Sequence, residues 1–574
     1  MQKKWHVKTL KDTTIVDAFR SKLKVDSIVA ELLLQRGIDS FDMAQDFFRP
    51  KLDQLHDPFL MKDMEVAVDR LQEAIDDDQK VMLFGDYDVD GTTAVAMMYS
   101  FLKDTLKVDY YIPDRYVEGY GLSKQGIDVA KEHDVSLIIC LDCGIKAVDK
   151  IAYAKSLGID FIVCDHHMPG EELPDAIVLD PKRKDCLYPY DELSGCGVGF
   201  KLLQGMCEHN NWSTDKLFEH LDLLAVSIGA DIVPVTGENR ILCYHGMKQL
   251  NANPRVAFKE LLTLANKQFP VTLTDVIFSI APRINAAGRL RSGKHAVALM
   301  VSENLDDITS LADDINNDNL ERRQLDQQIT EEAKEIVEKR WEERESFSNV
   351  VFKENWHKGV VGIVASRLIE KFYRPTIVLT ESNGMVTGSA RSIKDFNVYD
   401  ALNACSEHLE QFGGHMYAAG MTLKRENLEP FMEAFEAYAK ENLTSEMLIE
   451  EQEVDVELGF NQIFSSEENR MKIPKLKRIL SQFEPHGPGN MKPVFISKNV
   501  FSTDMRLLKE AHIKLSMTQP EHDVVIEGIG FNQSESANIV AAGMPFDVVY
   551  TLESNKWMDR ETLQLNIKDV RETV

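Results

Sequence analysis

The sequence is poor in the features that mark secreted or membrane-bound proteins. It has 8 cysteines in 574 residues, too few and too irregularly spaced for a disulfide framework, which favours a reducing compartment. No apolar run approaches the roughly 18–20 residues that a membrane helix needs, and the N-terminal residues lack the apolar core of a signal peptide. We therefore expect a cytoplasmic protein without a membrane segment.

The chain also lacks positive charge. Its 65 lysines and arginines face 93 aspartates and glutamates, which gives a formal net charge of −28. Proteins that coat nucleic acid by bulk attraction rely on lysine and arginine to displace counterions, so this class is excluded. Any contact with nucleic acid must be local and must adjoin an acidic site that metal neutralises.

Residues 305–347 lack both glycine and proline, and apolar side chains recur there at intervals of three and four. The pattern predicts one long helix, up to about 60 Å at 1.5 Å per residue. It lies between two segments, roughly 80–235 and 348–450, in which short apolar runs alternate with helical stretches, as is typical of α/β domains. A plain surface helix is an alternative, but the position favours a connecting helix.

A chain of 574 residues exceeds what one hydrophobic core usually serves. Towards the C-terminus, runs such as HIKLSM, FDVVYTLE and LQLNIKDV alternate at period two, which predicts a small antiparallel β-barrel of the OB type. The predicted fold class is multidomain α/β. The expected parts are an N-terminal helical preamble (1–75), a parallel-sheet domain (76–300), a connecting helix (301–347), a second α/β domain (348–450) and an OB-fold barrel (451–574).

Four apolar runs of the first α/β segment each end in an aspartate. Asp86 and Asp88 follow the first run, Asp142 the second, Asp165 the third and Asp180 the fourth. The carboxyl ends of parallel strands lie along one edge of a sheet, so we expect these side chains to converge. One such aspartate is often a helix cap, but four in succession, with DYDVDG and DHH among them, are hard to explain as caps.

Carboxylates this close repel one another unless a cation neutralises them. Oxygen ligands with a few imidazoles suit Mn²⁺ or Mg²⁺ and fit soft metals poorly. Two such ions about 3.5–4 Å apart can activate a water and stabilise the leaving oxygen of a phosphoester. The residues therefore predict hydrolytic phosphoryl transfer.

FGDYDVDGTTA, LDCGI, CDHH and GADIVP resemble the metal-site motifs of the DHH phosphoesterase superfamily. YIPDRYVEGYGLS, SGCGVGFKL, APRINAAGRL, WHKGVVGIVASRL, GSARSI and QFGGHMYAAGMTL are similar to the RecJ family within it. The resemblance implies a DHH domain, a DHH-associated domain and an OB domain. It also implies a single-stranded-DNA-specific exonuclease that acts 5′ to 3′, releases mononucleotides and serves DNA recombination and repair.

The resemblance further implies roles for individual residues in the site. Two ions of Mn²⁺ or Mg²⁺ would be bound, with Asp142 as the bridge, by Asp86, Asp88, Asp142, His166 and Asp231. Asp90, Asp165 and His167 would orient these ligands or contact the scissile phosphate, although a structural role is the alternative for Asp90 and Asp165. The implied catalytic residues are Asp88, Asp90, Asp142, Asp165, His166 and His167. Asp180 is not counted, because the family often has asparagine there.

Contacts to nucleic acid are implied in the same way. Arg115, Ser389 and Arg391 would bind the 5′-terminal phosphate, which an arginine pair can grip through several oxygens. The channel for the strand would be lined by Arg283, Asn285, Arg289, Gly414 and His415. A role in fixing loops is the alternative for the first three, and a plain glycine turn for the last two.

The implied partners are single-stranded DNA, a helicase that supplies unwound ends and a single-strand-binding protein, and we expect a monomer. Two other functions remain open. A small-molecule phosphoesterase would need the two α/β domains alone, so the terminal barrel speaks against it. A non-catalytic DNA-binding scaffold is opposed by the intact set of ligand residues.

Overall fold

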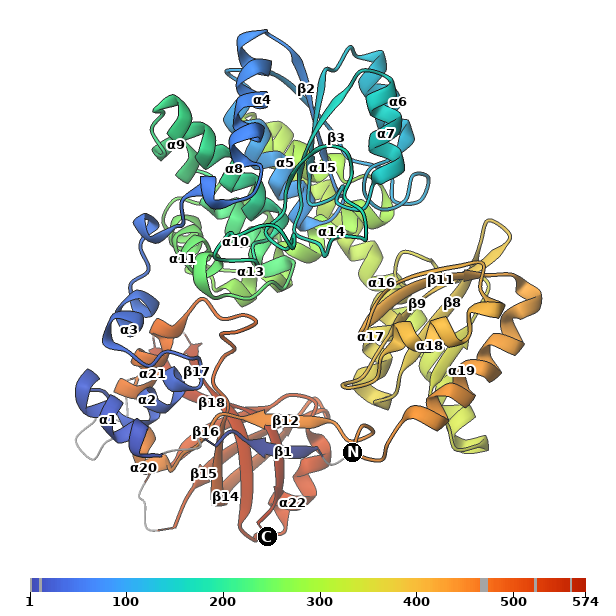
Figure 1. Cartoon of the computed structure of the whole chain (residues 1–574). Coiled ribbons are helices and arrows are strands. Elements are labelled where there is room, and N and C mark those ends of the chain that lie inside the picture. The colour runs from blue at the N-terminus through green and yellow to red at the C-terminus, as the bar shows by residue number, and fades with distance from the viewer. Residues whose placement is uncertain (1–2, 10–12, 465–472, 521–523, 558–559, 574) are drawn as a thin grey trace. The chain divides into compact units, whose positions relative to one another are not determined.

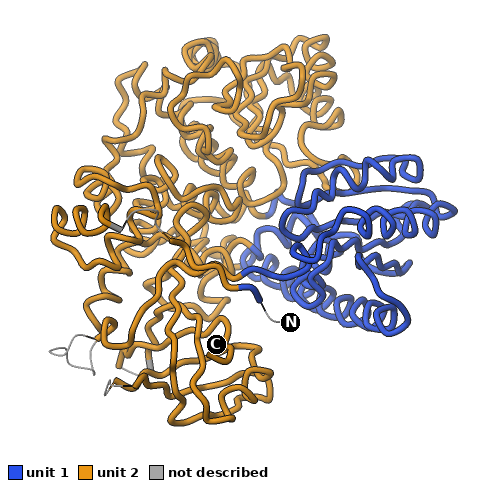
Figure 2. Tube along the Cα trace, turned by 60° about the horizontal axis from the view of Figure 1, so that its bottom comes forward, with its two compact units in different colours: residues 1–4, 282–295, 310–451 blue, residues 5–281, 296–309, 452–574 orange. Residues whose placement is uncertain are grey.

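The structure is a computed structural model that describes residues 3–9, 13–464, 473–520, 524–557 and 560–573. The chain divides into two compact units, drawn in different colours in Figure 2. Unit 1 comprises residues 1–4, 282–295 and 310–451. Unit 2 comprises residues 5–281, 296–309 and 452–574.

The four aspartate-ending runs and one further strand, β3, form a five-stranded parallel sheet in unit 2, and the parallel sheet was predicted. Its strands, in the order β3-β2-β4-β5-β6, are β2 (Lys80–Gly85), β3 (Lys107–Tyr111), β4 (Leu137–Leu141), β5 (Asp160–Cys164) and β6 (Ile177–Leu179). Every pairing is parallel. Gly85 pairs with Leu141, and Leu141 pairs with Cys164. The residues that follow these strands therefore leave the sheet along one edge.

Helices cover both faces of this sheet (Figure 1). One face packs on α6 (Lys124–Glu132) and α7 (Val148–Ser156), whose apolar residues share a core with the strands. On the other face α5 (Val89–Leu102) is buried along nearly its whole length, because it packs on two further helices. These neighbours are α8 (Gly195–Asn210) and α10 (Leu221–Ala230). Unit 2 continues with α11 (Gly237–Ala252), α12 (Val256–Leu264), α13 (Leu273–Ser279) and α15 (Lys294–Val301).

The predicted OB barrel closes at the C-terminal end of unit 2. Its strands are β14 (Phe495–Leu508), β15 (His512–Thr518), β16 (Ile526–Gly530), β17 (Phe546–Trp557) and β18 (Arg560–Glu572). They pair in the order β14-β15-β16-β18-β17, and β14 also pairs with β17, so the sheet returns on itself. Closure removes the exposed strand edges that an open sheet would present.

The N-terminal segment packs in two directions. Helix α4 (Met64–Asp76) packs on α8 beside the parallel sheet. In contrast, α1 (Thr13–Leu23), α2 (Ser27–Leu34) and α3 (Phe41–Phe48) share a hydrophobic core with the barrel. Phe47, for example, meets Phe483 edge-on with ring centroids 5.2 Å apart. The preamble thus joins the barrel as well as the sheet domain that follows it.

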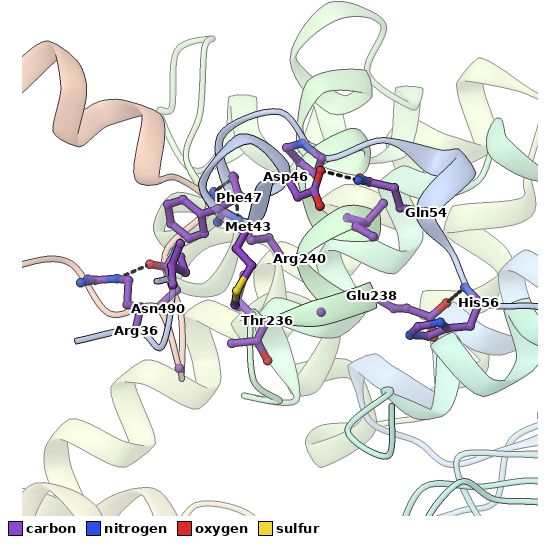
Figure 3. Close-up of a pocket in the computed structure, with 16 residues that line it drawn as sticks. Arg36, Met43, Asp46, Phe47, Gln54, His56, Thr236, Glu238, Arg240 and Asn490 are labelled. Carbon is purple, nitrogen blue, oxygen red and sulfur yellow. Dashed lines mark hydrogen bonds between the residues drawn. The ribbon is translucent and has the colours of Figure 1, made fainter. Parts of the chain in front are cut away.

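Arg240 of α11 connects α3 to the segment that precedes the barrel (Figure 3). Its guanidinium stacks on the Phe47 ring at 3.9 Å and donates to the carbonyls of Phe47, Phe483, Glu484 and Pro485. Burial lowers its pKa to about 10. A cavity of about 390 Å³ opens beside it. Because main-chain carbonyls take up the guanidinium donors, we assign Arg240 a role in packing.

Unit 1 holds the second α/β domain and most of α16. Helix α16 (Leu305–Glu343) is a single helix of 39 residues that begins in unit 2 and continues in unit 1, as predicted for a connecting helix. The sheet, in the order β10-β11-β9-β8-β7, consists of β7 (Asn349–Phe352), β8 (Thr376–Ser382), β9 (Met385–Arg391), β10 (Gln411–His415) and β11 (Ala418–Leu423). Its helices are α14 (Ala281–Leu290), α17 (Val361–Phe372), α18 (Val398–Ala404) and α19 (Leu428–Asn442).

Two expectations about composition can be checked. All 8 cysteines are free thiols, as expected of a chain without a disulfide framework. Among the described residues no helix combines the length and the apolarity required to cross a bilayer.

Candidate metal centre

The turn after β2 places Asp86 and Asp88 at the edge of the sheet. Asp88 is the N-cap of α5, and its Oδ1 accepts a hydrogen bond from the Gly91 amide at 3.1 Å. A Cβ on Gly91 would lie 2.5 Å from the Asp86 carbonyl oxygen and 2.6 Å from its nitrogen. Glycine is therefore required at position 91 for the turn to close. The helix-capping alternative thus holds for Asp88 together with its place in the acidic cluster.

Asp142 follows β4 in a left-handed backbone conformation, with φ +60°. Its amide donates to the Cys164 carbonyl at 2.9 Å, which fixes the residue against the end of β5. Its Oδ1 lies 3.2 Å from His166 Nε2 and 3.9 Å from His167 Nδ1. The strained turn directs the carboxylate toward both histidines.

Three groups of side chains lie close enough to hold a cation among the described residues. They are Asp86, Asp88 and Asp142; Asp142, His166 and His167; and Asp90, His166 and Asp231, each with its ligand atoms within 4.8 Å of one another. Asp142 and His166 each belong to two groups. The side chains predicted from separate segments are thus brought together at one edge of the sheet.

Several polar atoms in this cluster are buried and make no hydrogen bond in the described structure. They are Asp86 Oδ2, Asp142 Oδ1 and both ring nitrogens of His166. Buried polar atoms are nearly always paired, because leaving one unpaired costs about 1–3 kcal/mol. Oxygen and imidazole atoms that converge without hydrogen bonds form the donor set that a hard divalent cation takes. The residues present therefore fit Mn²⁺ or Mg²⁺.

Electrostatics of the carboxylates support the same conclusion. Burial raises the pKa values of Asp86, Asp88 and Asp142, and the negative charges of neighbouring aspartates raise them further. Burial and the charges of Asp90 and Asp88 raise the pKa of Asp231 to about 8. Burial lowers the pKa of His166, which favours the neutral imidazole that a metal requires.

Asp90 and Asp165 are held by hydrogen bonds of their own. Asp90 accepts from the amides of Gly195 at 2.6 Å and Cys196 at 2.9 Å and from Ser227 Oγ at 2.6 Å. It ties α5 to α8 and α10. Asp165 accepts from the Ile145 amide at 3.0 Å and from His167 Nδ1 at 2.8 Å. These contacts suit an orienting role, in which the two carboxylates fix the side chains and backbone around the cluster.

His167 lies at the centre of a chain of three side chains. Its Nδ1 contacts Asp165, and its Nε2 lies 3.2 Å from the Tyr120 hydroxyl. Although burial would lower the pKa of His167, the hydrogen bond and the charge of Asp165 raise it to about 9. In the metal-free protein His167 is therefore an imidazolium at neutral pH, a charge suited to a phosphate oxygen. Tyr120 lies in the loop between β3 and α6. The next residue of this loop also reaches the acidic cluster, because the Gly121 amide donates to Asp86 Oδ1 at 3.4 Å.

Asp180, which ends β6, lies outside the three groups. It is fully buried, its Oδ1 accepts from the Lys182 amide at 2.7 Å, and burial raises its pKa to about 7. This position agrees with its exclusion from the expected ligands.

Metal stabilisation of the fold should grow with pH. In the metal-free protein the pKa of Asp231 is raised, so its contribution to stability is present at low pH and is lost as pH rises through about 8. Cation binding needs the deprotonated carboxylates and relieves their repulsion. We expect saturating Mg²⁺ to raise the thermal midpoint more at pH 8.5 than at pH 6, measured by differential scanning fluorimetry. A rise in the thermal midpoint with Mg²⁺ that is smaller at pH 8.5 than at pH 6 would contradict this electrostatic account.

In unit 1 the two residues expected at the 5′ phosphate lie on one face of β9, two positions apart. Arg391 Nη1 donates to Ser389 Oγ at 2.7 Å. Gly362, in the first turn of α17, lies against both: a Cβ there would be 2.9 Å from Arg391 Nη2 and 3.1 Å from Ser389 Oγ. Ser389, Arg391 and the N-terminal end of α17 therefore meet at one place, where helix amides and a guanidinium favour an anion.

The other expected DNA contacts belong to several different elements. Arg115 belongs to unit 2, where its guanidinium stands 4.9 Å from the centre of the Tyr87 ring. Arg283, Asn285 and Arg289 all lie on α14, and Arg289 Nη1 donates to the Gly359 carbonyl at 3.0 Å. Gly414 and His415 end the exposed edge strand β10. A Cβ on Gly414 would lie 2.3 Å from the Ala418 carbonyl oxygen, so glycine is needed for strand pairing there.

Reasoning from the sequence missed three residues around these sites. Tyr120 and Gly195 touch the acidic cluster, and Gly362 touches the Ser389–Arg391 pair. Each lies within a motif already singled out, YIPDRYVEGYGLS, SGCGVGFKL or WHKGVVGIVASRL. Their presence in these motifs was the one sequence feature that could have pointed to them, since no spacing rule connects these residues to their contacts.

Comparison with known families assigns the parts of the chain. The DHH family N-terminal domain matches residues 80–228, the DHHA1 domain residues 346–441 and the RecJ OB domain residues 469–569.

Individual proteins and structures are similar over most of the chain. The single-stranded-DNA-specific exonuclease RecJ of Bacillus subtilis is 38% identical over 563 residues, which cover 97% of this chain and 70% of that protein. The exonuclease of the same name from Salmonella typhimurium is 32% identical, with coverage of 88% and 89%. The crystal structure of RecJ from Thermus thermophilus in complex with Mn²⁺ superimposes with a TM-score of 0.83 at 25% identity. That comparison covers 100% of this chain and 80% of the other.

Proposed function

The chain belongs to the RecJ family of single-stranded-DNA-specific exonucleases, and we propose that it degrades single-stranded DNA from the 5′ end by two-metal hydrolysis that releases mononucleotides. It is a metal-dependent phosphodiester hydrolase. The observation that carries the mechanism is the convergence of unpartnered buried oxygens and imidazole nitrogens at the edge of the parallel sheet. We further propose that it acts in the cytoplasm as a monomer, with a helicase and a single-strand-binding protein, in DNA recombination and repair.

We assign the cation ligands to Asp86, Asp88, Asp142, His166 and Asp231, with Asp142 shared by both positions. When bound, two Mn²⁺ or Mg²⁺ ions supply Lewis acidity to the phosphodiester and a nucleophilic water at neutral pH. The remaining residues prepare this site. Asp90 fixes the start of α8 against the cluster.

His167 is assigned to the scissile phosphate. Asp165 holds its ring through Nδ1, which leaves Nε2 on the open side next to the Tyr120 hydroxyl. When its ring is protonated, His167 can donate from Nε2 to a phosphate oxygen, and the Asp165 carboxylate, which raises the pKa of His167 to about 9 in the metal-free protein, favours that state. The side chain is 43% exposed, which leaves room for a substrate to approach.

The activity is tested by digestion of end-labelled DNA. We expect 5′-labelled single strands to release labelled mononucleotide with Mn²⁺ or Mg²⁺, to stay intact with chelator, and to be cut far faster than duplex. Long single strands should also be preferred over a dinucleotide. Binding of single strands without cleavage at saturating Mn²⁺ would instead favour the non-catalytic scaffold.

Recognition of the 5′ end is assigned to Arg115 together with Ser389 and Arg391. Arg391→Ala should reduce the preference for 5′-phosphorylated over 5′-hydroxyl strands about tenfold or more, because a charge-assisted contact to phosphate is worth about 1.5–3 kcal/mol. Gly362→Ala should act in the same direction, since the added methyl would displace both side chains. The measurement is the ratio of kcat/KM for the two kinds of end.

Arg425→Ala is the control for this prediction, since Arg425 lies in the same domain and stacks on Phe352 at 4.1 Å. It should leave the ratio unchanged. A parental ratio in both Arg391→Ala and Gly362→Ala would exclude this pair of β9 side chains from end recognition.

A further inference from the structure

The residue after Asp231 has a backbone conformation that its side chain disfavours. Helix α10 ends with Asp231 as its C-cap, and Ile232 follows in the left-handed region, with φ +61°. An L-side chain is crowded there, and a β-branched one most of all, so the position ordinarily takes glycine or asparagine. In the part of the chain that the structure describes, Ile232 is the one apolar side chain on a residue with positive φ.

Other helices of unit 2 end on residues that tolerate this conformation. The residues that follow the C-caps of α4, α6, α7 and α12, each with a positive φ, are Asp78, Asp134, Gly158 and Asn266. The end of α10 could have been closed in the same way. Backbone strain of the kind found at Ile232 collects at functional sites, where the side chain has a use that outweighs the cost.

Packing in the core does not explain the choice of isoleucine. Ile232 is 68% exposed, whereas Val233 and Val235 of the same segment are buried. An exposed apolar residue needs no explanation by itself, but one that is also strained does. The hydrophobic effect favours this side chain only when something covers it. Isoleucine therefore fits a contact that is made when substrate is bound.

The metal centre lies directly beside Ile232. Its neighbour Asp231 is a candidate cation ligand, with Oδ2 3.4 Å from His166 Nε2 and a side chain that is 25% exposed. Because adjacent Cα atoms are about 3.8 Å apart, the exposed isoleucine stands at the edge of the site. An aliphatic side chain offers no hydrogen bond to a phosphate, but it can pack on the carbon atoms of the sugar next to that phosphate.

We propose that Ile232 contacts the sugar of the nucleotide at the metal centre and favours deoxyribose over ribose there. This inference rests on the proposed function. The 2′-hydroxyl is the group by which a protein distinguishes RNA from DNA. An aliphatic side chain that covers this hydroxyl removes its hydrogen bonds to water and replaces none of them. An apolar pocket can discriminate against an added hydroxyl by up to about a hundredfold.

The test compares two 5′-phosphorylated oligodeoxynucleotides, one of which carries ribose in its first two nucleotides. The measurement is the ratio of kcat/KM for the all-deoxy strand to that for the ribose-bearing strand, with Mn²⁺. We expect the ratio to fall at least about tenfold in Ile232→Gly, which removes the side chain, and in Ile232→Asn, whose amide can bond to the hydroxyl. Neither variant should lower the thermal midpoint, because glycine and asparagine tolerate the left-handed backbone.

Asn266→Gly is the matched control, since Asn266 is exposed and follows the C-cap of α12 with φ +56°. It places glycine in the same backbone conformation outside the metal centre, so the ratio should stay parental. A parental ratio in both Ile232 variants, an equal fall in Asn266→Gly, or a parent that cuts both strands equally fast would overturn the sugar contact and leave the exonuclease assignment intact. A lower thermal midpoint in Ile232→Gly would contradict the strain. A parent that cuts neither strand would overturn the proposed function as well.

Discussion

Asp142→Asn is expected to abolish cleavage of single-stranded DNA while leaving DNA binding almost intact. The substitution keeps the size and shape of the side chain but removes the charge shared by two of the candidate cation groups. Loss of the Lewis-acid contribution, worth several kcal/mol, corresponds to a fall in kcat of at least about a thousandfold. Asparagine also tolerates the left-handed backbone at this position, with φ +60°. The effect can then be attributed to the charge.

The measurement is single-turnover digestion of a 5′-labelled oligonucleotide, together with its binding affinity in chelator. Asp134→Asn is the matched control, because Asp134 also has a left-handed backbone, with φ +55°, and its side chain is 91% exposed. It should cut at the parental rate. Cleavage by Asp142→Asn within about tenfold of the parent would contradict the role of Asp142.

Gly195→Ala is expected to cause the second largest loss. A Cβ at this position would lie 2.5 Å from Asp142 Cβ and 2.7 Å from its Oδ1, so either Asp142 or the start of α8 must move. The Gly195 amide also donates to Asp90 at 2.6 Å, and that hydrogen bond would shift as well. A displacement of about 1 Å in a catalytic group can cost roughly a hundredfold in rate. We expect kcat/KM to fall by about that factor and Mn²⁺ affinity to fall with it.

Gly197→Ala separates this effect from general damage to α8. A Cβ at Gly197 would meet its nearest neighbour, Leu193 Cβ, at 3.4 Å, an ordinary contact. Isothermal titration with Mn²⁺, rates of digestion and circular dichroism should show a folded, active Gly197→Ala and a folded but impaired Gly195→Ala. If Gly195→Ala bound Mn²⁺ with parental affinity, the close approach of α8 to Asp142 would not contribute to metal binding.

The acidic edge of the sheet could be predicted because the signal is local. Four of the five strands are apolar runs followed by an aspartate, and parallel pairing alone brings Asp86, Asp142 and Asp165 together. Gly195 and Tyr120 could not be placed in this way. Their contacts depend on how α8 and the loop after β3 fold back on the sheet, a long-range matter that residue spacing does not encode.

In the rest of the chain, too, local patterns predicted the elements but not how they pack. The absence of glycine and proline was enough to predict α16, and period-two alternation was enough to predict the barrel strands. The packing of α1–α3 into the barrel core joins segments more than 400 residues apart, as in the contact of Phe47 with Phe483. Apolar helices can be predicted from sequence, but the surface that covers them follows only from the tertiary fold.

The central claim is that this edge of the sheet holds a pair of hard cations, and anomalous diffraction from a crystal soaked in Mn²⁺ tests it most directly. The account predicts two adjacent peaks contacted by Asp86, Asp88, Asp142, His166 and Asp231, with Asp142 touching both. The absence of peaks at saturating Mn²⁺, or peaks held by other side chains, would contradict it.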